Sequence, residues 1–164
     1  MFHWRAFDLV GIIVMICGSS QSPIYYVFYC EESLYYQKLY LGIVYVTCFI
    51  AGFVVMRPGT LRNHRKQYVC AFAFVIAGWS SSPGIIHMIW YRDSRNMYAF
   101  NVWPWLTGGL MYTFGALFYA VRFPERCFKG WFDILGSSHQ IFHIFIVIAS
   151  VIHGSASLQE FHKR

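Results

Sequence analysis

Five long apolar stretches constrain the fold of this chain more than any other feature. Each is close to the roughly 20 residues that a helix needs to cross the hydrocarbon core of a bilayer. They cover residues 9–29, 39–56, 68–90, 103–121 and 134–153. Backbone groups in hydrocarbon must be hydrogen-bonded within their own segment, and the alternating pattern of barrel strands is absent. We therefore predict an all-α integral membrane protein with a single transmembrane domain over residues 1–164.

Charged residues are too few for a soluble globule or a disordered chain. They make up 12% of the 164 residues, against about a quarter in an ordinary soluble domain, while aromatic residues reach 21%. A disordered chain needs low hydrophobicity and high charge, and a soluble domain needs charge to cover its surface. The net charge of +6 is carried in short clusters between the apolar stretches, which is typical of membrane topology. We therefore expect no nucleic-acid partner.

The five cysteines are isolated along the chain, with no CxxC pair and no even framework. This spacing favours neither a disulfide scaffold nor a thiolate metal site, and we expect small apolar residues instead. They are Cys17, Cys30, Cys48, Cys70 and Cys127.

The basic residues predict the orientation in the membrane. If every stretch crosses, eight of the 13 Lys and Arg residues lie on the side of the N-terminus and five on the other. The positive-inside rule then places the N-terminus in the cytoplasm and the C-terminus outside, in the plasma membrane or an endomembrane. The first stretch lacks the charged flank and cleavage site of a signal peptide, so we expect a retained span.

Three helix-breaking or small residues fall inside predicted helices, namely Pro83, Gly108 and Gly109. A kink or close helix packing is the first interpretation, and the wall of a cavity is the alternative.

His139 and His143 are the strongest local sign of chemistry. They are four residues apart in a predicted span, so both imidazoles project from one face of one helix. That spacing allows both rings to reach one metal ion. The alternative is a pair of polar side chains that hydrogen-bond to neighbouring helices. Ionisable side chains are costly within a bilayer, which favours a functional role.

Asp8 is the best candidate partner for the two histidines, because it lies at the same predicted depth. Either it is a carboxylate at a helix N-terminus, or it binds the metal or a metal-bound water. His3 is a weaker candidate on the same side. We expect His87 to line a cavity or interface near the opposite face, His64 to be solvated, and His153 to lie too far away to take part.

The run RFPERCFKGWFDILGSSHQIFH at residues 122–143 resembles the most characteristic segment of the progestin and adipoQ receptor family. That family includes the adiponectin receptors and the haemolysin-III-like proteins. The resemblance continues through Ser157–Phe161, which looks like the adiponectin receptor branch. Phe7 and Asp8, with the stretch GIIVMICGSSQSPIYYVFYC, look like the third membrane helix of the family. The similarity therefore covers nearly the whole chain.

The resemblance implies a seven-helix fold, of which this chain would contain the last five helices. It also implies a Zn²⁺ ion near the cytoplasmic face, held by three histidines. By match to the motif, His139 and His143 would be two of these ligands, and Asp8 would contact the zinc-bound water. The third histidine belongs to the second helix of the family, upstream of Asp8, and His3 is too close to Asp8 to take that role. Lys129 stands where the family usually has proline.

Two functions from different classes follow from the resemblance. One is a receptor that responds to an extracellular protein hormone or a lipid, with zinc in a structural or switching role. The other is a hydrolase that cleaves a lipid amide, as a ceramidase does, and so acts in lipid metabolism. A third interpretation is a chain that binds no metal and associates with full-length relatives. Membrane lipids and a second copy of the chain are the remaining expected partners.

Overall fold

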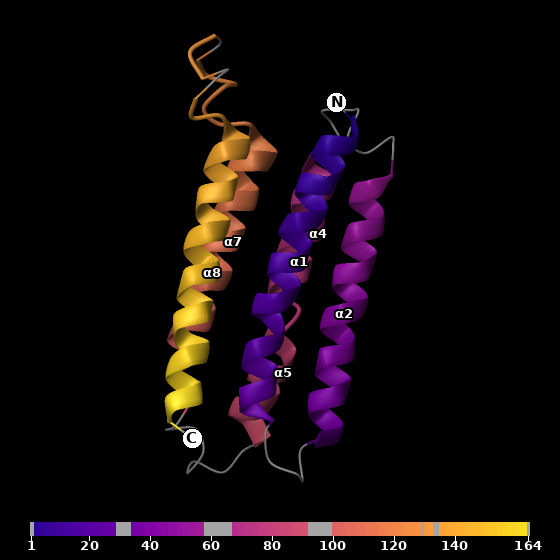
Figure 1. The fold of residues 1–164 in the computed structure, drawn as a ribbon, viewed down its shortest axis with the longest axis vertical. Coiled ribbons are helices and arrows are strands. Elements are labelled where there is room, and N and C mark those ends of the chain that lie inside the picture. The colour runs from indigo at the N-terminus through magenta and orange to yellow at the C-terminus, as the bar shows by residue number, and fades with distance from the viewer. Residues whose placement is uncertain are drawn as a thin grey trace.

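The structure is a computed structural model that describes residues 2–28, 34–57, 67–91, 100–128, 130–132 and 135–163. Side chains are described from Ala6 onward, and that of Tyr91 is not described. The helices are α1 (Phe2–Val27), α2 (Leu34–Met56), α4 (Gln67–Trp79), α5 (Ser82–Tyr91), α7 (Trp103–Val121) and α8 (Ser138–His162) (Figure 1). Within these ranges all regular structure is helical, so the predicted all-α class is confirmed.

Four helical segments are long and apolar enough to cross a membrane. They are Ala6–Val27, Leu34–Met56, Gln67–Trp90, which joins α4 and α5, and Ser138–His162. The fifth long helix, α7, has 19 residues and is not one of these four segments. The protein is therefore a multi-pass integral membrane protein.

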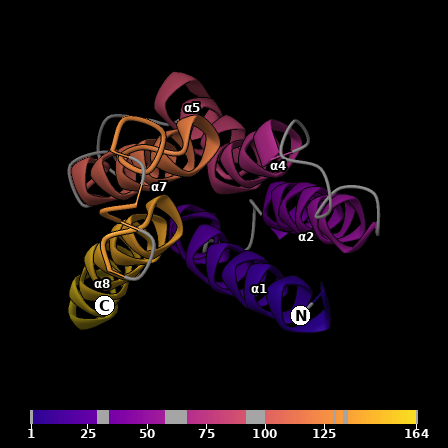
Figure 2. The same cartoon turned by 90° about the horizontal axis from the view of Figure 1, so that it is seen from above.

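The helices form a closed ring when viewed along the bundle (Figure 2). Successive neighbours are α2 against α4, α4 against α7, and α7 against α8, and α1 closes the ring between α8 and α2. The N-terminal ends of α1 and α8 lie at the same end of the bundle (Figure 1). This arrangement places the first and last helices, α1 and α8, side by side, while the two termini lie at opposite ends of the bundle.

The helices bury apolar side chains inward and also present apolar side chains outward. Phe74 and Phe142 are fully buried and pack against each other with their ring centroids 5.3 Å apart. By contrast, Phe49 is 78% exposed and Trp90 is 81% exposed. Large apolar groups on the outside would be unfavourable in water, but they match a hydrocarbon surrounding.

The third stretch departs from the prediction, because it consists of two helices rather than one. Pro83 has no N–H group to donate to the carbonyl of Trp79, and its ring would crowd that carbonyl in a continuous helix. The hydroxyl of Ser82 donates to Trp79 O instead, at 2.6 Å. The chain turns at Ser80 and Ser81, and α5 starts afresh. The predicted kink is therefore a break between α4 and α5.

Other helix ends also differ from the predicted ranges. α1 begins at Phe2 rather than residue 9, and α2 begins at Leu34 rather than residue 39. α8 begins at Ser138 rather than residue 134 and continues to His162 rather than residue 153. Polar residues in a helix end lower the local hydropathy without ending the helix, which explains the early predicted stop.

Gly108 and Gly109 lie at close helix contacts, in agreement with the packing interpretation. A Cβ on Gly108 would lie 2.1 Å from His153 Nε2 on α8. A Cβ on Gly109 would lie 3.4 Å from the Trp79 ring on α4. Neither glycine lines the groove described below.

Some predictions lie outside the described part of the molecule. They concern the side chains of His3 and Arg5 and the residues Cys30, His64, Arg62, Arg65, Lys66, Arg92, Arg95, Lys129 and Arg164.

Candidate metal centre

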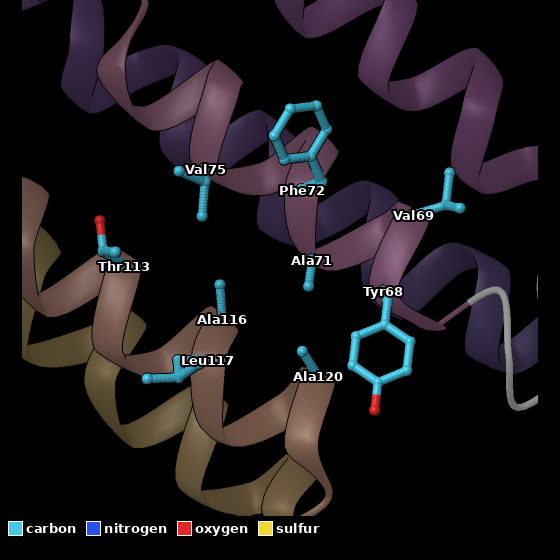
Figure 3. Close-up of a pocket in the computed structure, with 9 residues that line it drawn as sticks. All are labelled: Tyr68, Val69, Ala71, Phe72, Val75, Thr113, Ala116, Leu117 and Ala120. Carbon is cyan, nitrogen blue, oxygen red and sulfur yellow. The ribbon is translucent and has the colours of Figure 1, made fainter.

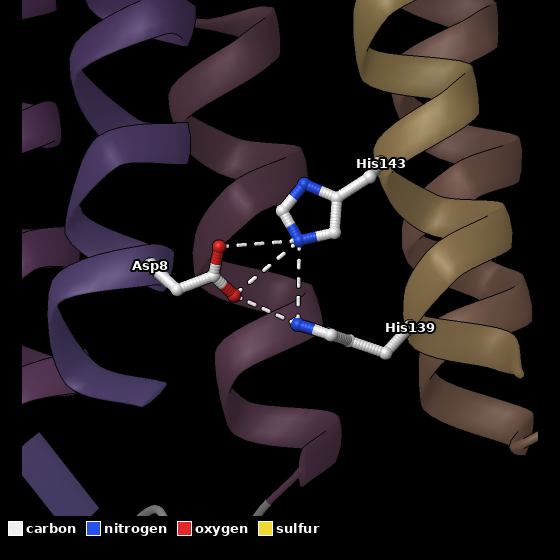
Figure 4. A group of neighbouring side chains, drawn as sticks. All are labelled: Asp8, His139 and His143. Atoms are coloured by element: carbon white, nitrogen blue, oxygen red, sulfur yellow. Dashed lines mark hydrogen bonds and ion pairs between the residues drawn. The ribbon is translucent and has the colours of Figure 1, made fainter. Parts of the chain in front are cut away.

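Three side chains converge at one end of the bundle, Asp8 from α1 and His139 and His143 from α8 (Figure 4). The Nε2 atom of His139 lies 2.7 Å from Asp8 Oδ2, and His143 Nε2 lies 3.3 Å from the same oxygen. The two Nε2 atoms are themselves 3.3 Å apart. The metal-binding atoms of the cluster all lie within 4.8 Å of one another. The structure thus brings together the three residues predicted for the site.

Capping of α8 determines where the first histidine lies. Ser137 is the N-cap residue, and its hydroxyl accepts a hydrogen bond from Gln140 N at 3.4 Å. The side chain of Gln140 reaches back and accepts from Gly136 N at 2.7 Å. This is a variant of the capping box, in which two otherwise unsatisfied N–H groups are paired. His139 therefore projects from the first turn of a well-defined helix, and His143 projects one turn later.

Aromatic side chains support the cluster from the side of α7. The buried ring of Tyr119 lies 5.6 Å from the His139 ring between centroids. Phe142 stacks on Tyr119 at 5.2 Å. The side chains of Asp8, His139 and His143 are 37%, 31% and 37% exposed, so the cluster is half-buried and accessible to a small ion.

The donor set and its spacing fit a divalent metal ion. Nitrogen ligands of zinc lie about 2.0–2.1 Å from the ion, and a tetrahedral arrangement separates two of them by about 3.3–3.4 Å. The 3.3 Å between the two Nε2 atoms matches that separation. A single proton on His139 Nε2 can satisfy Asp8 or His143, but not both fully, whereas one cation can accept lone pairs from all three groups. Two imidazoles and a carboxylate are ordinary zinc ligands.

Asp8 makes a different contact with each histidine. Its 2.7 Å contact with His139 is the length of a charge-assisted hydrogen bond and is shorter than the separation of two tetrahedral ligands. Its 3.3 Å contact with His143 matches that separation. Both predicted roles of Asp8 remain compatible with this geometry, that is, a metal ligand or an acceptor for a water on the metal.

The remaining described histidines lie away from the cluster. His153 is buried against α7, with Nε2 3.3 Å from Trp105 O. His87 Nδ1 lies 2.9 Å from the Tyr40 hydroxyl, at the far end of the bundle, within an aromatic interface. These positions agree with the predicted exclusion of His153 and with the interface role of His87.

Sequence reasoning missed two features that hold the site. The pattern Ser137-x-x-Gln140 is a recognisable capping signal, and it would have placed the start of the last helix correctly. Glu125 is 13 residues before Ser138 and accepts hydrogen bonds from its N–H at 2.8 Å and its hydroxyl at 3.0 Å. No spacing rule predicts a contact of this kind.

An apolar groove of about 590 Å³ lies between α4 and α7 (Figure 3). Small side chains on its floor, including Ala71, Ala116 and Ala120, leave room between the two helices. One end of the groove is at Tyr68 and Ala120, at the end of the bundle that holds the cluster. Tyr119, next to Ala120, faces His139, so α7 separates the groove from the cluster.

Comparison with known proteins shows similarity over almost the whole chain. Residues 2–154 match the profile of a family described as haemolysin-III related. The chain is 35% identical over 154 residues to Heptahelical transmembrane protein 3 of Arabidopsis thaliana, a match that covers 93% of this chain and 43% of that protein.

Two animal proteins show similar levels of identity. The chain is 37% identical over 148 residues to the Adiponectin receptor protein of Drosophila melanogaster, covering 89% of this chain and 32% of that protein. It is 36% identical over 147 residues to Progestin and adipoQ receptor-like protein 1 of Caenorhabditis elegans, covering 89% of this chain and 33% of that protein. The chain thus spans less than half the length of each of these three relatives.

Proposed function

Because the chain belongs to the haemolysin-III-related family, together with adiponectin-receptor-like membrane proteins, we propose that it is a receptor of this type with a zinc site. The convergence of Asp8, His139 and His143 carries the proposal. Zinc held by these residues has a structural or switching role, since it would join two neighbouring helices, α1 and α8. The ligand of the receptor is an extracellular protein hormone or a lipid.

A metal that links α1 to α8 provides a physical basis for a switch. The two helices are the first and last of the chain, and their contact closes the ring. Asp8 and His139 are 131 residues apart in sequence, so a metal between them would couple distant segments. A ligand that moved either helix would alter the geometry of the cluster, and by linkage metal binding would alter ligand affinity.

Metal content tests this proposal. The full chain, purified in detergent or nanodiscs, is expected to retain about one zinc ion, measured by elemental mass spectrometry. His139→Ala and His143→Ala should each lose most of this zinc, because each removes a ligand. His162→Ala is the matched control, since it removes an exposed histidine from the far end of α8. Equal zinc in wild type and both ligand variants would show that these histidines do not hold it, and no zinc above background in wild type would favour a chain that binds no metal and associates with relatives.

The donor set of the cluster supports a second candidate function, a zinc-dependent hydrolase of lipid amides. The side chains of Asp8, His139 and His143 are only half-buried, which leaves the cluster open to a substrate. Zinc, when bound, lowers the pKa of a coordinated water towards 7 and polarises a carbonyl. Asp8 would orient that water or accept its proton, and His139 and His143 would hold the metal.

Release of fatty acid from ceramide separates the hydrolase from the receptor. Under the hydrolase hypothesis, release should be abolished by a chelator and by Asp8→Asn, which keeps the shape of the side chain but removes its basicity. Zinc binding without fatty-acid release would leave the receptor as the better interpretation. Release that persists in the presence of chelator would contradict a metal-dependent reaction.

A further inference from the structure

The side chain of Glu125 holds the first turn of α8. Its Oε1 atom accepts a hydrogen bond from the backbone N–H of Ser138 at 2.8 Å and another from the Ser138 hydroxyl at 3.0 Å. Ser138 is the first residue of α8 and is only 3% exposed. One carboxylate therefore ties the turn after α7 to the helix that carries both histidines.

Backbone hydrogen bonds fix the turn from which Glu125 projects. The N–H of Arg126 donates to Arg122 O at 2.9 Å, and that of Cys127 donates to Pro124 O at 2.9 Å. Arg122 itself donates to Phe118 O and so ends α7 directly before this turn. The carboxylate is thus presented to α8 from a fixed position.

The charge of Glu125 suits its place at a helix start. The first N–H groups of a helix have no partner within the helix, and together they carry a partial positive charge. A carboxylate that accepts from such a group forms a charge-assisted hydrogen bond, roughly twice as strong as a neutral one. Glu125 therefore adds to the capping by Ser137 and Gln140 rather than duplicating it.

We propose that Glu125 is a positioning residue for the metal centre. His139 directly follows Ser138, in the turn where a helix frays most readily, whereas His143 lies one turn deeper. By anchoring Ser138, Glu125 keeps the His139 imidazole within 2.7 Å of Asp8. The consequence for metal binding rests on the proposed zinc site, but the anchor itself needs no metal.

The test compares Glu125→Ala, Glu125→Gln and wild type in the full chain. Amide hydrogen exchange of peptides covering residues 136–141 reports the anchor without metal. Cobalt(II) titration reports affinity, and the visible absorption of bound cobalt reports ligand geometry. Glu160→Ala is the matched control, because Glu160 accepts hydrogen bonds from Asn101 N–H at 3.4 Å and Lys163 Nζ at 2.6 Å at the other end of α8.

We expect Glu125→Ala to exchange at least about tenfold faster at residues 136–141. Its cobalt affinity should fall by about 10–100-fold, as is usual when a group that orients a ligand is lost, and the cobalt spectrum should change. Glu125→Gln should remain within about threefold of wild type, because its amide oxygen still accepts from Ser138. Glu160→Ala should affect exchange only near its own end of α8.

Unchanged exchange in Glu125→Ala would overturn the proposal, and so would faster exchange with wild-type cobalt affinity and spectrum. If wild type binds no cobalt, the metal site fails, and the positioning role is decided by chemical modification. Diethyl pyrocarbonate should then modify His139 faster, relative to His143, in Glu125→Ala than in wild type. An unchanged ratio would overturn the positioning role as well.

Discussion

Asp8 lies in a membrane-spanning helix, where a carboxylate is costly unless partners offset its charge. Its neighbours Phe7 and Leu9 face opposite ways, since Phe7 is 71% exposed and Leu9 only 1%. The Asp8 side chain points between them, towards two imidazoles of α8. Each of the three groups thus relieves the cost of the others, and a bound cation would relieve it further.

Metal binding by this cluster should depend on pH. Imidazoles bind a metal only in their neutral form, and imidazole free in water titrates near pH 6.5. We expect full zinc or cobalt affinity above about pH 7 and a loss of about two to three orders of magnitude between pH 7.5 and pH 5, since two protons compete with the metal. Competition titrations at fixed ionic strength would measure this.

The exposed His162→Ala variant should follow the same curve as wild type. A constant affinity from pH 7.5 to pH 5 would argue against binding through His139 and His143.

At the scale of helices, α7 and α8 approach closely because α7 presents glycines to its neighbour. A Cβ on Gly115 would lie 2.8 Å from Phe145 Cβ, and a Cβ on Gly108 would lie 2.1 Å from His153 Nε2. The two glycines are seven residues apart and so share one face of α7. Small residues at such positions let membrane helices pack backbone to backbone, which gives the pair its tight interface.

Gly108→Ala should destabilise this interface. His153 is only 5% exposed and packs against the rings of Trp105 and Tyr112, at 5.0 and 5.8 Å, so it has little room to move. We expect the free energy of unfolding to fall by about 1–3 kcal/mol, the usual cost of overpacking. Reversible unfolding in mixed detergent micelles would measure the change.

Gly154→Ala is the matched control on α8. A Cβ there would have no neighbour within 4 Å, so the variant should be neutral or more stable by up to about 1 kcal/mol through helix propensity. Equal effects of the two substitutions would show that packing against His153 is not the cause.

At the scale of the molecule, α1 closes the ring and places the cluster at the end of the bundle that also holds the N-terminus (Figure 1). The turn after α7, with Glu125 and the exposed thiol of Cys127, lies at this end as well. The excess of basic residues on this side predicts that it faces the cytoplasm.

Cysteine labelling would test this orientation. In a chain whose other cysteines are replaced by serine, a membrane-impermeant maleimide should label Cys127 only after the cells are permeabilised. Lys163→Cys in a chain without Cys127 should be labelled in intact cells, because residue 163 lies at the opposite end. The reverse pattern would invert the proposed topology.

The sequence predictions are most accurate for features that depend on interactions between residues close together in the sequence. The apolar stretches predicted the long helices, and the spacing of His139 and His143 predicted that they share one face of a helix, because both features depend on local periodicity. Pro83 predicted an irregularity in the third stretch. Whether the helix would kink or end there depended on the Ser82 hydroxyl, which donates a hydrogen bond to Trp79 O. The contact between Glu125 and Ser138 depended on the path of a turn, which no periodicity describes.

The amino-acid sequence by itself determined that this chain is helical and lies in a membrane, since hydrocarbon requires every backbone group to be paired within a short segment. It also determined, through motif resemblance, the family to which the chain belongs. Only the tertiary structure decided that α1 lies beside α8, that Asp8 reaches the two imidazoles across 131 and 135 residues, and that Glu125 anchors their helix. Those contacts come from how side chains fit between separate helices, and that fit is a property of the packed bundle rather than of any one segment.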